Sequence, residues 1–344
     1  MPVSIREVAA AAEVSLSTVS KVLNSSANAQ ISPATRKRVQ DAARRLGYHP
    51  NAIARGLVRK QMNTLGMVMA YDQLSVTSDP YLGPVLDGIL AVNKRNHQKT
   101  VIFAEESWES ALENISTYCD GHCDGLMLII PRLDVPIIEE IRRRDVPFIL
   151  VGDSREGEGL ASVDCDNVAG SREIVHYLIQ QGHRRIACLL GNAELPSTAE
   201  RHQGYWLALT EAGIPYDASL ALPGEYWETS GYENALKVLD WPEEKRPTAL
   251  FCGNDRIAIG AYQALEERGA RVPEAMSVVG FDDILGVQAL RPGLTTMRHP
   301  IREVGERAAE MLLALIRRES PRGPRERLAP TLVIRDSVAP LREG

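Results

Sequence analysis

The sequence predicts a small N-terminal all-α helix-turn-helix domain, followed by a larger α/β body made of two lobes, each with a doubly wound parallel sheet. Three observations lead to this prediction. Residues 1–49 contain three short amphipathic segments with capping residues at their ends. From residue 61 onward, apolar strand-like runs alternate with amphipathic helical runs in two successive series. Residues 1–60 also hold ten lysines and arginines against three acids, whereas the whole chain carries a net charge of −6.

The first two helices are predicted from their caps. Ser4 and Glu7 have the spacing of a capping box, and the alanine-rich residues 8–12 continue the helix. Ser15 is the expected N-cap of a second helix over 16–23. A tight turn therefore separates the two helices.

The second helix has two different faces. Val19, Val22 and Leu23 share an apolar face that would pack against the other helices. The opposite surface is small and mostly polar, as a helix that enters a groove requires. It is formed by Leu16, Ser17, Ser20 and Lys21.

A third helix over 33–46 completes the unit, with Ser32 as its N-cap, Pro33 in its first turn and Gly47 as its stop. A helix-turn-helix of this kind places its second helix in the major groove of DNA. Protein-interaction modules also use three such helices, so the helix pattern leaves both functions open. The basic head (about +7) on an acidic body (−13) favours a polyanionic partner for the head, with a solvated basic face as the alternative.

The head resembles that of the lactose/galactose-repressor (LacI/GalR) family. The resemblance rests on four stretches in the same order and spacing: 5–9 (IREVA), 14–24 (VSLSTVSKVLN), 38–48 and 50–57 (PNAIARGL). Glu13 departs from the pattern, because many members have glycine at this place in the turn. The resemblance implies a transcription regulator, most commonly a repressor, that binds a near-palindromic operator in double-stranded DNA.

The resemblance also implies roles for single residues. Leu16, Ser17 and Lys21 would read bases, with Lys21 donating to guanine and Leu16 contacting a thymine methyl group. Thr18, Ser20 and Asn24 would contact phosphates, and plain helix surface is the alternative for Thr18 and Ser20. The full expected set of DNA contacts is Ser4, Leu16, Ser17, Thr18, Ser20, Lys21, Asn24, Asn51, Arg55 and Leu57.

Residues 50–60 are the expected hinge between head and body. The stretch 50–57 resembles the family's hinge helix, and eight residues are too few for a stable isolated helix. We therefore expect it to order only on DNA and beside a partner chain. Leu57 would be an apolar wedge in the minor groove, and Arg55 would lie near the DNA backbone.

The body is expected to contain two series of buried parallel strands. Strands are predicted at 65–70, 100–104, 125–130 and 147–151, then at 185–190, 220–222, 249–252 and 277–281, with a last strand around 328–335. Helices are predicted near 81–96, 109–119, 135–144, 168–181, 198–212, 230–239, 255–269 and 301–318.

The family resemblance continues in the body, at 123–126, 181–187, 253–260 and 277–283, and implies a fold like that of periplasmic sugar-binding proteins. In such folds the chain crosses between the lobes three times, here near 164–166, 292–295 and 320–325. The expected lobes are 61–164 with 294–320, and 165–293 with 321–344. Such sheets bind ligands at the carboxyl ends of their strands, which places an effector cleft between the lobes.

Candidate effector residues are polar or aromatic groups that follow strands. The resemblance points most directly to Arg201, Asn254 and Asp282, since a guanidinium and a carboxylate suit hydroxyl groups and an aromatic ring stacks on a sugar face. The expected set is Tyr81, Leu82, Asp166, Ser197, Arg201, Tyr226, Trp227, Asn254 and Asp282. Trp108 could reach the cleft mouth or pack on the surface. For Asp255 and Asp283, helix capping or a turn is the preferred interpretation.

Other classes of function find little support. The sequence lacks a GxGxxG after the first strand, a phosphate-loop lysine motif and a GxSxG elbow, so we expect neither an enzyme nor a cofactor. Five scattered cysteines indicate reduced thiols, and one Cys119–Cys123 pair makes a weak metal motif. A secreted binding protein would not explain the basic head, and an architectural DNA binder would not explain the body. No apolar stretch is long enough for a membrane span, and a cytoplasmic location is expected.

The expected mechanism is therefore a linkage between two ligands. A small molecule, with a sugar as the favoured class, would shift the lobes and change the affinity of a homodimer for its operator. An inducer and a corepressor would use the same architecture. No heptad repeat follows the last expected strand, so a dimer without a tetramerising tail is expected.

Overall fold

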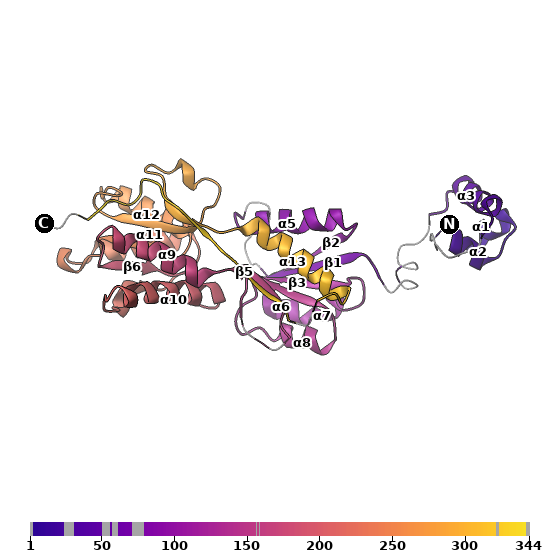
Figure 1. The fold of residues 1–344 in the computed structure, drawn as a ribbon, viewed down its shortest axis with the longest axis horizontal. Helices are drawn as coiled ribbons and strands as arrows, with labels where there is room; N and C mark the ends of the chain where they lie inside the picture. Colours follow the sequence, from indigo (N-terminus) through magenta and orange to yellow (C-terminus); the bar gives the residue numbers. More distant parts are fainter. Residues whose placement is uncertain are drawn as a thin grey trace. The chain divides into compact units, whose positions relative to one another are not determined.

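The computed structural model describes residues 3–23, 31–49, 56, 61–70, 79–155, 157, 159–320 and 323–341. The chain divides into two compact units, Met1–Thr64 and Leu65–Gly344 (Figure 1). The expected hinge helix over 50–57 lies outside the described residues apart from Gly56.

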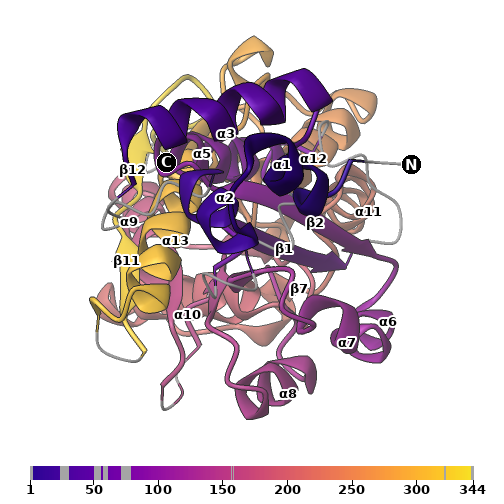
Figure 2. The same ribbon diagram turned by 90° about the vertical axis from the view of Figure 1, so that its right-hand side faces the viewer.

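The first unit contains the three predicted helices, α1 (Ile5–Ala12), α2 (Leu16–Leu23) and α3 (Pro33–Leu46), packed together (Figure 2). The predicted capping box is present, and the Ser4 hydroxyl donates to Glu7 Oε2 over 2.8 Å. Ser32 caps α3, where its Oγ accepts a hydrogen bond from the Thr35 amide. The helices hold together through small apolar side chains, above all Val8, Val19 and Val39, which are fully buried.

Glu13, which departs from the family pattern, ends α1 in the left-handed region with φ of 51°. Glycine adopts this conformation without steric cost, whereas another L-residue pays on the order of 1 kcal/mol. The turn between α1 and α2 is therefore the reason that glycine is common at this position. This chain makes the same turn with a glutamate.

The N-terminal lobe contains a six-stranded sheet in the order β11-β5-β4-β3-β1-β2. Its strands are β1 (Thr64–Ala70), β2 (Lys99–Glu105), β3 (Gly125–Ile129), β4 (Phe148–Val151), β5 (Ser162–Cys165) and β11 (Arg325–Leu328). One face packs on α5 (Leu82–Arg95) and α13 (Ile301–Ile316), and the other on α6 (Trp108–Glu113), α7 (Ile115–Tyr118) and α8 (Ile137–Arg143) (Figure 1). Side chains alternate between these faces along β1: Met67 and Met69 face α5 and α13, whereas Val68 faces the other layer.

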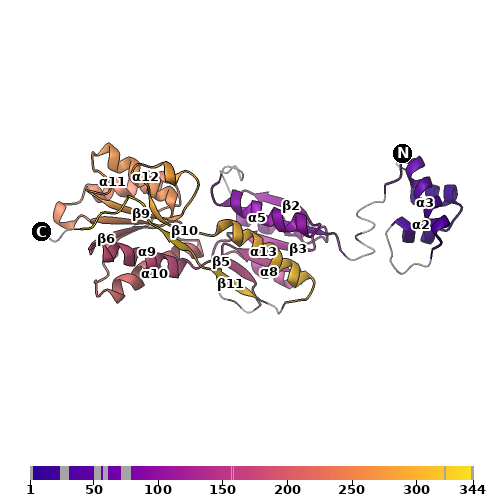
Figure 3. The same ribbon diagram turned by 45° about the horizontal axis from the view of Figure 1, so that its top comes forward.

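The C-terminal lobe repeats this architecture with the order β12-β10-β9-β8-β6-β7. Its strands are β6 (Ile186–Leu189), β7 (Ala221–Leu222), β8 (Ala249–Cys252), β9 (Ser277–Asp282), β10 (Thr295–Arg298) and β12 (Thr331–Val333). Helices α9 (Asn167–Gln180) and α10 (Pro196–Glu211) cover one face, and α11 (Glu228–Leu239) and α12 (Asp255–Glu267) cover the other (Figure 3). Short 3-10 turns lie at Ala218–Leu220, Glu243–Lys245 and Val287–Ala289.

The chain passes between the lobes three times. The first passage follows β5, where it was expected. The second follows β10, which pairs with β9 in the C-terminal lobe, so it lies at 299–300 rather than at 292–295. The third separates β11 from β12, at 329–330 rather than at 320–325, because β11 pairs with β5. The expected lobe boundaries at 294 and 321 shift accordingly, since strand pairing and not local composition decides to which sheet a short strand belongs.

Four strand predictions need correction. β5 and β10 were not predicted as strands, and the expected strand around 328–335 is in fact β11 and β12 on different lobes. β12 pairs antiparallel with β10 in an otherwise parallel sheet. β2 was expected to be buried, but it is the edge strand, and Val101 and Ile102 are 37% and 43% exposed.

Candidate functional site

A cleft of about 850 Å³ lies between the two lobes. Its walls come from the carboxyl ends of strands in both sheets, as expected for doubly wound α/β units. Asp79, Tyr81 and Trp108 contribute from the N-terminal lobe, and Arg201 and Asp282 from the C-terminal lobe. Both lobes thus supply groups that a single small molecule can contact.

The structure brings most of the predicted effector residues together in this cleft. The residues that line it are Tyr81, Ser197, Arg201, Tyr226, Trp227, Asn254 and Asp282. Trp108, for which two positions were considered, is buried and also lines the cleft.

Two predicted effector residues are not part of the described lining. Leu82 is in the first turn of α5, is 1% exposed and packs in the core of the N-terminal lobe. Asp166 is the N-cap of α9, where its Oδ1 accepts a hydrogen bond from the Ala169 amide at 3.0 Å. Both positions were predicted from proximity along the chain to Tyr81 and to the lobe crossing. In the structure the Leu82 side chain is directed into the core, and the Asp166 side chain is directed to the start of α9.

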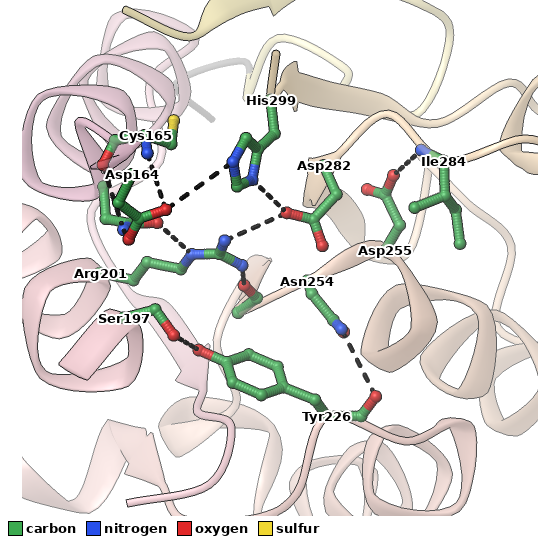
Figure 4. Close-up of polar contacts among 12 residues, drawn as sticks. Asp164, Cys165, Ser197, Arg201, Tyr226, Asn254, Asp255, Asp282, Ile284 and His299 are labelled. Atoms are coloured by element: carbon green, nitrogen blue, oxygen red, sulfur yellow. Dashed lines mark hydrogen bonds and ion pairs between the residues drawn. The ribbon is translucent and has the colours of Figure 1, made fainter. Parts of the chain in front are cut away.

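Arg201 is the best-connected side chain of the cleft (Figure 4). Its Nε donates to Asn167 Oδ1 at 2.9 Å, and its Nη2 lies 3.1 Å from Asp282 Oδ1. The Gly253 carbonyl accepts from Nη1, and the guanidinium carbon lies 3.9 Å from the centre of the Phe281 ring. Five donors in a rigid plane make arginine suited to such a site, and here each of the three guanidinium nitrogens donates one hydrogen bond within the protein.

His299 bridges two buried carboxylates next to Arg201. Its Nδ1 lies 3.3 Å from Asp282 Oδ1, and its Nε2 lies 3.9 Å from Asp164 Oδ1 (Figure 4). Asp164 is at the end of β5 and His299 follows β10, so this network spans the first two passages between the lobes. Sequence reasoning missed both residues, although the position of Asp164 beside the first crossing was a usable signal.

Burial raises the pKa of Asp164 to about 6, although His299 and the Cys165 amide act in the opposite direction. The buried carboxyl group of Asp255 behaves similarly: burial and the neighbouring Asp282 raise its pKa well above the usual value. Asp255 was expected to cap a helix or form a turn. It instead accepts from Thr296 Oγ1 and the Ile284 amide, and Asn254 is the cap of α12.

The pKa of Asp164 predicts a pH dependence of stability. The folded protein binds more protons than the unfolded chain between about pH 4 and pH 6, so the contribution of this group is largest in acid and is lost as the pH rises through about 6. We expect the unfolding free energy of Asp164→Asn, relative to wild type, to be higher at about pH 7.5 than at about pH 5. Urea unfolding at both pH values measures it. The variant also loses one hydrogen-bond acceptor, which changes its unfolding free energy by the same amount at both pH values. A difference in unfolding free energy between variant and wild type that is the same at both pH values would contradict the prediction.

The other predicted residues form a hydrogen-bonding rim. The Tyr226 hydroxyl lies 3.2 Å from Ser197 Oγ and accepts from Thr198 Oγ1 at 2.9 Å. Asn254 accepts from the Ile257 amide at 2.9 Å and donates weakly to the Tyr226 carbonyl. These contacts hold the Tyr226 ring in a defined position at the cleft wall.

A second arginine, Arg256, enters the cleft from α12 of the same lobe. Arg256 donates from two nitrogens to the two carboxylate oxygens of Glu228, both at 2.7 Å, and its guanidinium carbon lies 4.2 Å from the Trp227 ring centre. Its Nη1 is 3.9 Å from Asp79 in the N-terminal lobe. Asp79 also caps α5 by accepting from the Tyr81 and Leu82 amides.

The head presents α2 as a candidate DNA-binding surface. Val19 and Val22 are buried, whereas Leu16 (44% exposed), Ser17 and Lys21 point outward. Further predicted contacts are engaged within the head or partly covered: Thr18 Oγ1 is 2.9 Å from Ser15 Oγ, Ser20 is half-buried and Ser4 is part of the capping box. The remaining predicted contacts, Asn24, Asn51, Arg55 and Leu57, lie outside the described residues.

Comparisons with known proteins agree with both halves of this geometry. Residues 4–51 match the family described as bacterial regulatory proteins of the lacI family, and residues 175–338 match a periplasmic binding protein-like domain. The chain is 32% identical over 323 residues to catabolite control protein A of Priestia megaterium, covering 93% of this chain and 94% of the relative. The chain belongs to the lacI family of bacterial regulatory proteins. It is a DNA-binding transcriptional regulator.

Other lacI-family proteins are similarly close. The repressor CytR of Escherichia coli K12 is 33% identical over 312 residues, which covers 90% of this chain and 89% of CytR. The structure of a CelR–cellobiose complex has a TM-score of 0.75 at 30% identity and covers 97% of this chain and 99% of CelR. The lac repressor dimer bound to operator and an anti-inducer has a TM-score of 0.84 at 27% identity, with 98% and 100% of the two chains covered. These relatives are regulators and not enzymes. Within the described part of the chain, every helix is too short or too polar to span a bilayer.

Proposed function

We propose that this lacI-family regulator is a cytoplasmic repressor whose affinity for an operator depends on a small sugar-like molecule bound between the lobes. The observation that carries the proposal is the cleft, where aromatic rings, a buried guanidinium and carboxylates from both lobes face one space. This combination suits a polyhydroxylated ligand, because rings stack on its apolar faces and the polar groups pair with its hydroxyls. The cellobiose in the CelR complex supports the same class.

For the head, we propose that α2 enters the major groove. Lys21 would donate to a guanine, and Leu16 and Ser17 would contact neighbouring base edges. The exposure of these three side chains beside the buried Val19 and Val22 supports this orientation of the helix. We further propose that Leu57 acts as the minor-groove wedge of a hinge that folds on DNA.

We propose a homodimer joined through the second unit. Apolar side chains are exposed on α5 and on the edge strand β2, namely Leu90, Val101 and Ile102. An unpaired edge strand with exposed apolar residues is unfavourable in a monomer and is covered when a second chain packs on it. Two heads would then reach two half-sites of a near-palindromic operator. The lac repressor structure, which is a dimer bound to operator, supports this arrangement.

The experiment that tests this function measures the linkage between the two ligands. An operator is selected from random DNA with the purified protein, and cleft ligands are found by a thermal-shift screen of sugars, nucleosides and sugar acids. We expect a cleft ligand to change the operator Kd by about 5- to 150-fold, and the operator to change the Kd of the ligand by the same factor. Operator affinity that ignores every ligand of the cleft would refute the proposed function.

Two head variants test the proposed base contact, one by removing it and one as a matched control. Lys21→Ala is expected to weaken binding to the selected operator about tenfold or more while it changes binding to unrelated DNA much less, since it removes a base contact. Lys37→Ala removes the same charge from an exposed position on α3 and should weaken both to a similar, small extent.

A further inference from the structure

The cleft carries more negative than positive groups. Its lining contains the carboxylates of Asp79, Glu106, Asp164, Glu225, Glu228 and Asp282, and the cationic or titratable groups Arg132, Arg201, Arg256 and His299. A ligand's own charge therefore matters, because charges interact strongly in a site that excludes much of the water. Whether an anion could bind depends on whether any of these arginines is available to it.

Carboxylates of the chain itself already neutralise all three of these arginines. Arg201 is paired with Asp282, and its other two nitrogens donate to Asn167 and to the Gly253 carbonyl. Arg132 is paired with Glu194 across the lobes at 3.0 Å. Such pairs leave no net positive charge for a phosphate or carboxylate to contact.

Of the three arginines, Arg256 has the geometry most similar to that of an anion-binding arginine. It is also paired with a carboxylate of the protein. Glu228 takes two of its nitrogens in a bidentate arrangement, and Trp227 covers one face of its plane. Bidentate pairing with a carboxylate is the same geometry that arginine would use for a sugar phosphate or a uronic acid. Glu228 therefore occupies the position of an anionic ligand.

The helix N-termini at the cleft do not offset this negative charge. Asp79 accepts from the Leu82 amide at the start of α5, and Asn254 accepts from the Ile257 amide in the first turn of α12, so a side chain of the protein already occupies each of these two helix ends. α11 begins with Glu228 itself, and α10 begins at Pro196, which has no amide hydrogen. Asn192, in the segment before α10, donates a hydrogen bond of 2.8 Å to Glu225. The Glu225 carboxylate therefore adds negative charge near the start of α10.

The cleft also contains carboxylate oxygens that can accept hydrogen bonds from a ligand. Glu106 is exposed at the cleft and has no ion pair within the described residues, and Asp282 uses only Oδ1 for Arg201 and His299. Such oxygens accept hydrogen bonds from hydroxyl groups but repel a carboxylate or phosphate.

We propose that the cleft selects an uncharged polyhydroxylated ligand and rejects its phosphorylated and carboxylated derivatives, and that Glu228 enforces this by occupying Arg256. The inference rests on the proposed function, since it concerns the ligand of the same cleft. It narrows the ligand class from sugars and sugar acids to neutral sugars.

The test uses the full-length protein and inorganic phosphate as the first probe, with Trp fluorescence as the readout because Trp227 stacks on Arg256. Wild type is expected to show no saturable change beyond that of sodium chloride at equal ionic strength. Glu228→Gln keeps the size of the side chain but removes its charge, and it is expected to bind phosphate, and glucuronate as a second probe, about tenfold or more tighter than wild type. Glu233→Gln makes the same change at an exposed position of α11 outside the cleft and should behave as wild type.

Either of two outcomes overturns the inference. Saturable binding of phosphate or glucuronate to the wild-type cleft would show that anions are accepted, and a Glu228→Gln variant that remains silent would show that Glu228 does not exclude them. Failure of the proposed function is a separate result, in which no cleft ligand alters operator affinity. An anionic molecule that does alter it would uphold the function and refute this inference.

Discussion

Replacing Arg201 with alanine is expected to lower the unfolding free energy of the second unit by about 3–5 kcal/mol. The guanidinium is 5% exposed and is the ion-pair partner of Asp282, which is itself buried. Without Arg201, this carboxylate would remain in a poorly solvated site beside Asp255 with much less compensation. The loss of packing over the Phe281 ring adds to the effect. Urea unfolding followed by circular dichroism measures the change.

Arg201→Ala should also lose its response to the cleft ligand while its head still binds DNA. Two further variants separate these effects. Arg201→Lys keeps a positive charge but not the planar set of donors, so it should fold with a smaller loss and still respond poorly to ligand. Arg172→Ala removes a half-exposed arginine whose ion pair with Glu211 is at the surface, and it should cost no more than about 1 kcal/mol. Equal stability of Arg201→Ala and Arg172→Ala would contradict the central position that we assign to Arg201.

Gly260→Ala is expected to lower the unfolding free energy by about 1–3 kcal/mol, although alanine is the better helix former by about 1 kcal/mol. Gly260 lies where α12 crosses α11, and a Cβ atom there would overlap the Glu228 carbonyl oxygen. Gly231 on α11 makes the reciprocal approach to the Ile257 carbonyl. The two backbones are therefore too close for any side chain, and the helices must separate to admit one.

The damage from Gly260→Ala should extend to the cleft, because Glu228 and Trp227 begin α11. A shifted α11 moves the carboxylate away from Arg256, so we expect weaker ligand binding together with the lower stability. Gln263→Ala, at an exposed position of the same helix, tests helix propensity alone and should stay within about 0.5 kcal/mol of wild type. A Gly260→Ala protein as stable as wild type would show that the crossing can relax without cost.

The N-terminal lobe uses the same device. A Cβ atom at Gly88 on α5 would overlap the Arg302 carbonyl oxygen of α13, and one at Gly305 on α13 would overlap the Val85 carbonyl oxygen of α5. Each lobe thus closes one helix pair through two glycines that approach the opposite backbone. This correspondence follows from the similar architecture of the lobes and is not visible as a repeat in the sequence.

The three helices of the head could be predicted from the sequence. The caps at Ser4 and Ser32, the apolar face of α2 and the stop at Gly47 act through contacts within a few residues, so the local pattern contains the information. The same holds for the long helices of the body and for residues such as Asn254, which comes just after β8, and Arg201, which lies in the second turn of the helix that follows β6. The two-lobed organisation was predictable because each series of strands and helices is a local alternation.

Strand pairings and side-chain contacts between residues far apart in the chain could be found only in the tertiary structure. Strand 295–298 belongs to the C-terminal sheet because it pairs with β9, and strand 325–328 belongs to the N-terminal sheet because it pairs with β5. For this reason two of the three lobe crossings lie at other positions than the sequence predicted. The same shift brought His299 between Asp164 and Asp282. Likewise, the charge available in the cleft depends on the pairing of Arg256 with Glu228, which lie 28 positions apart in the chain. Residues separated in sequence show no local pattern of their contact, and so the character of the ligand site emerged only when the sheets and helices were assembled.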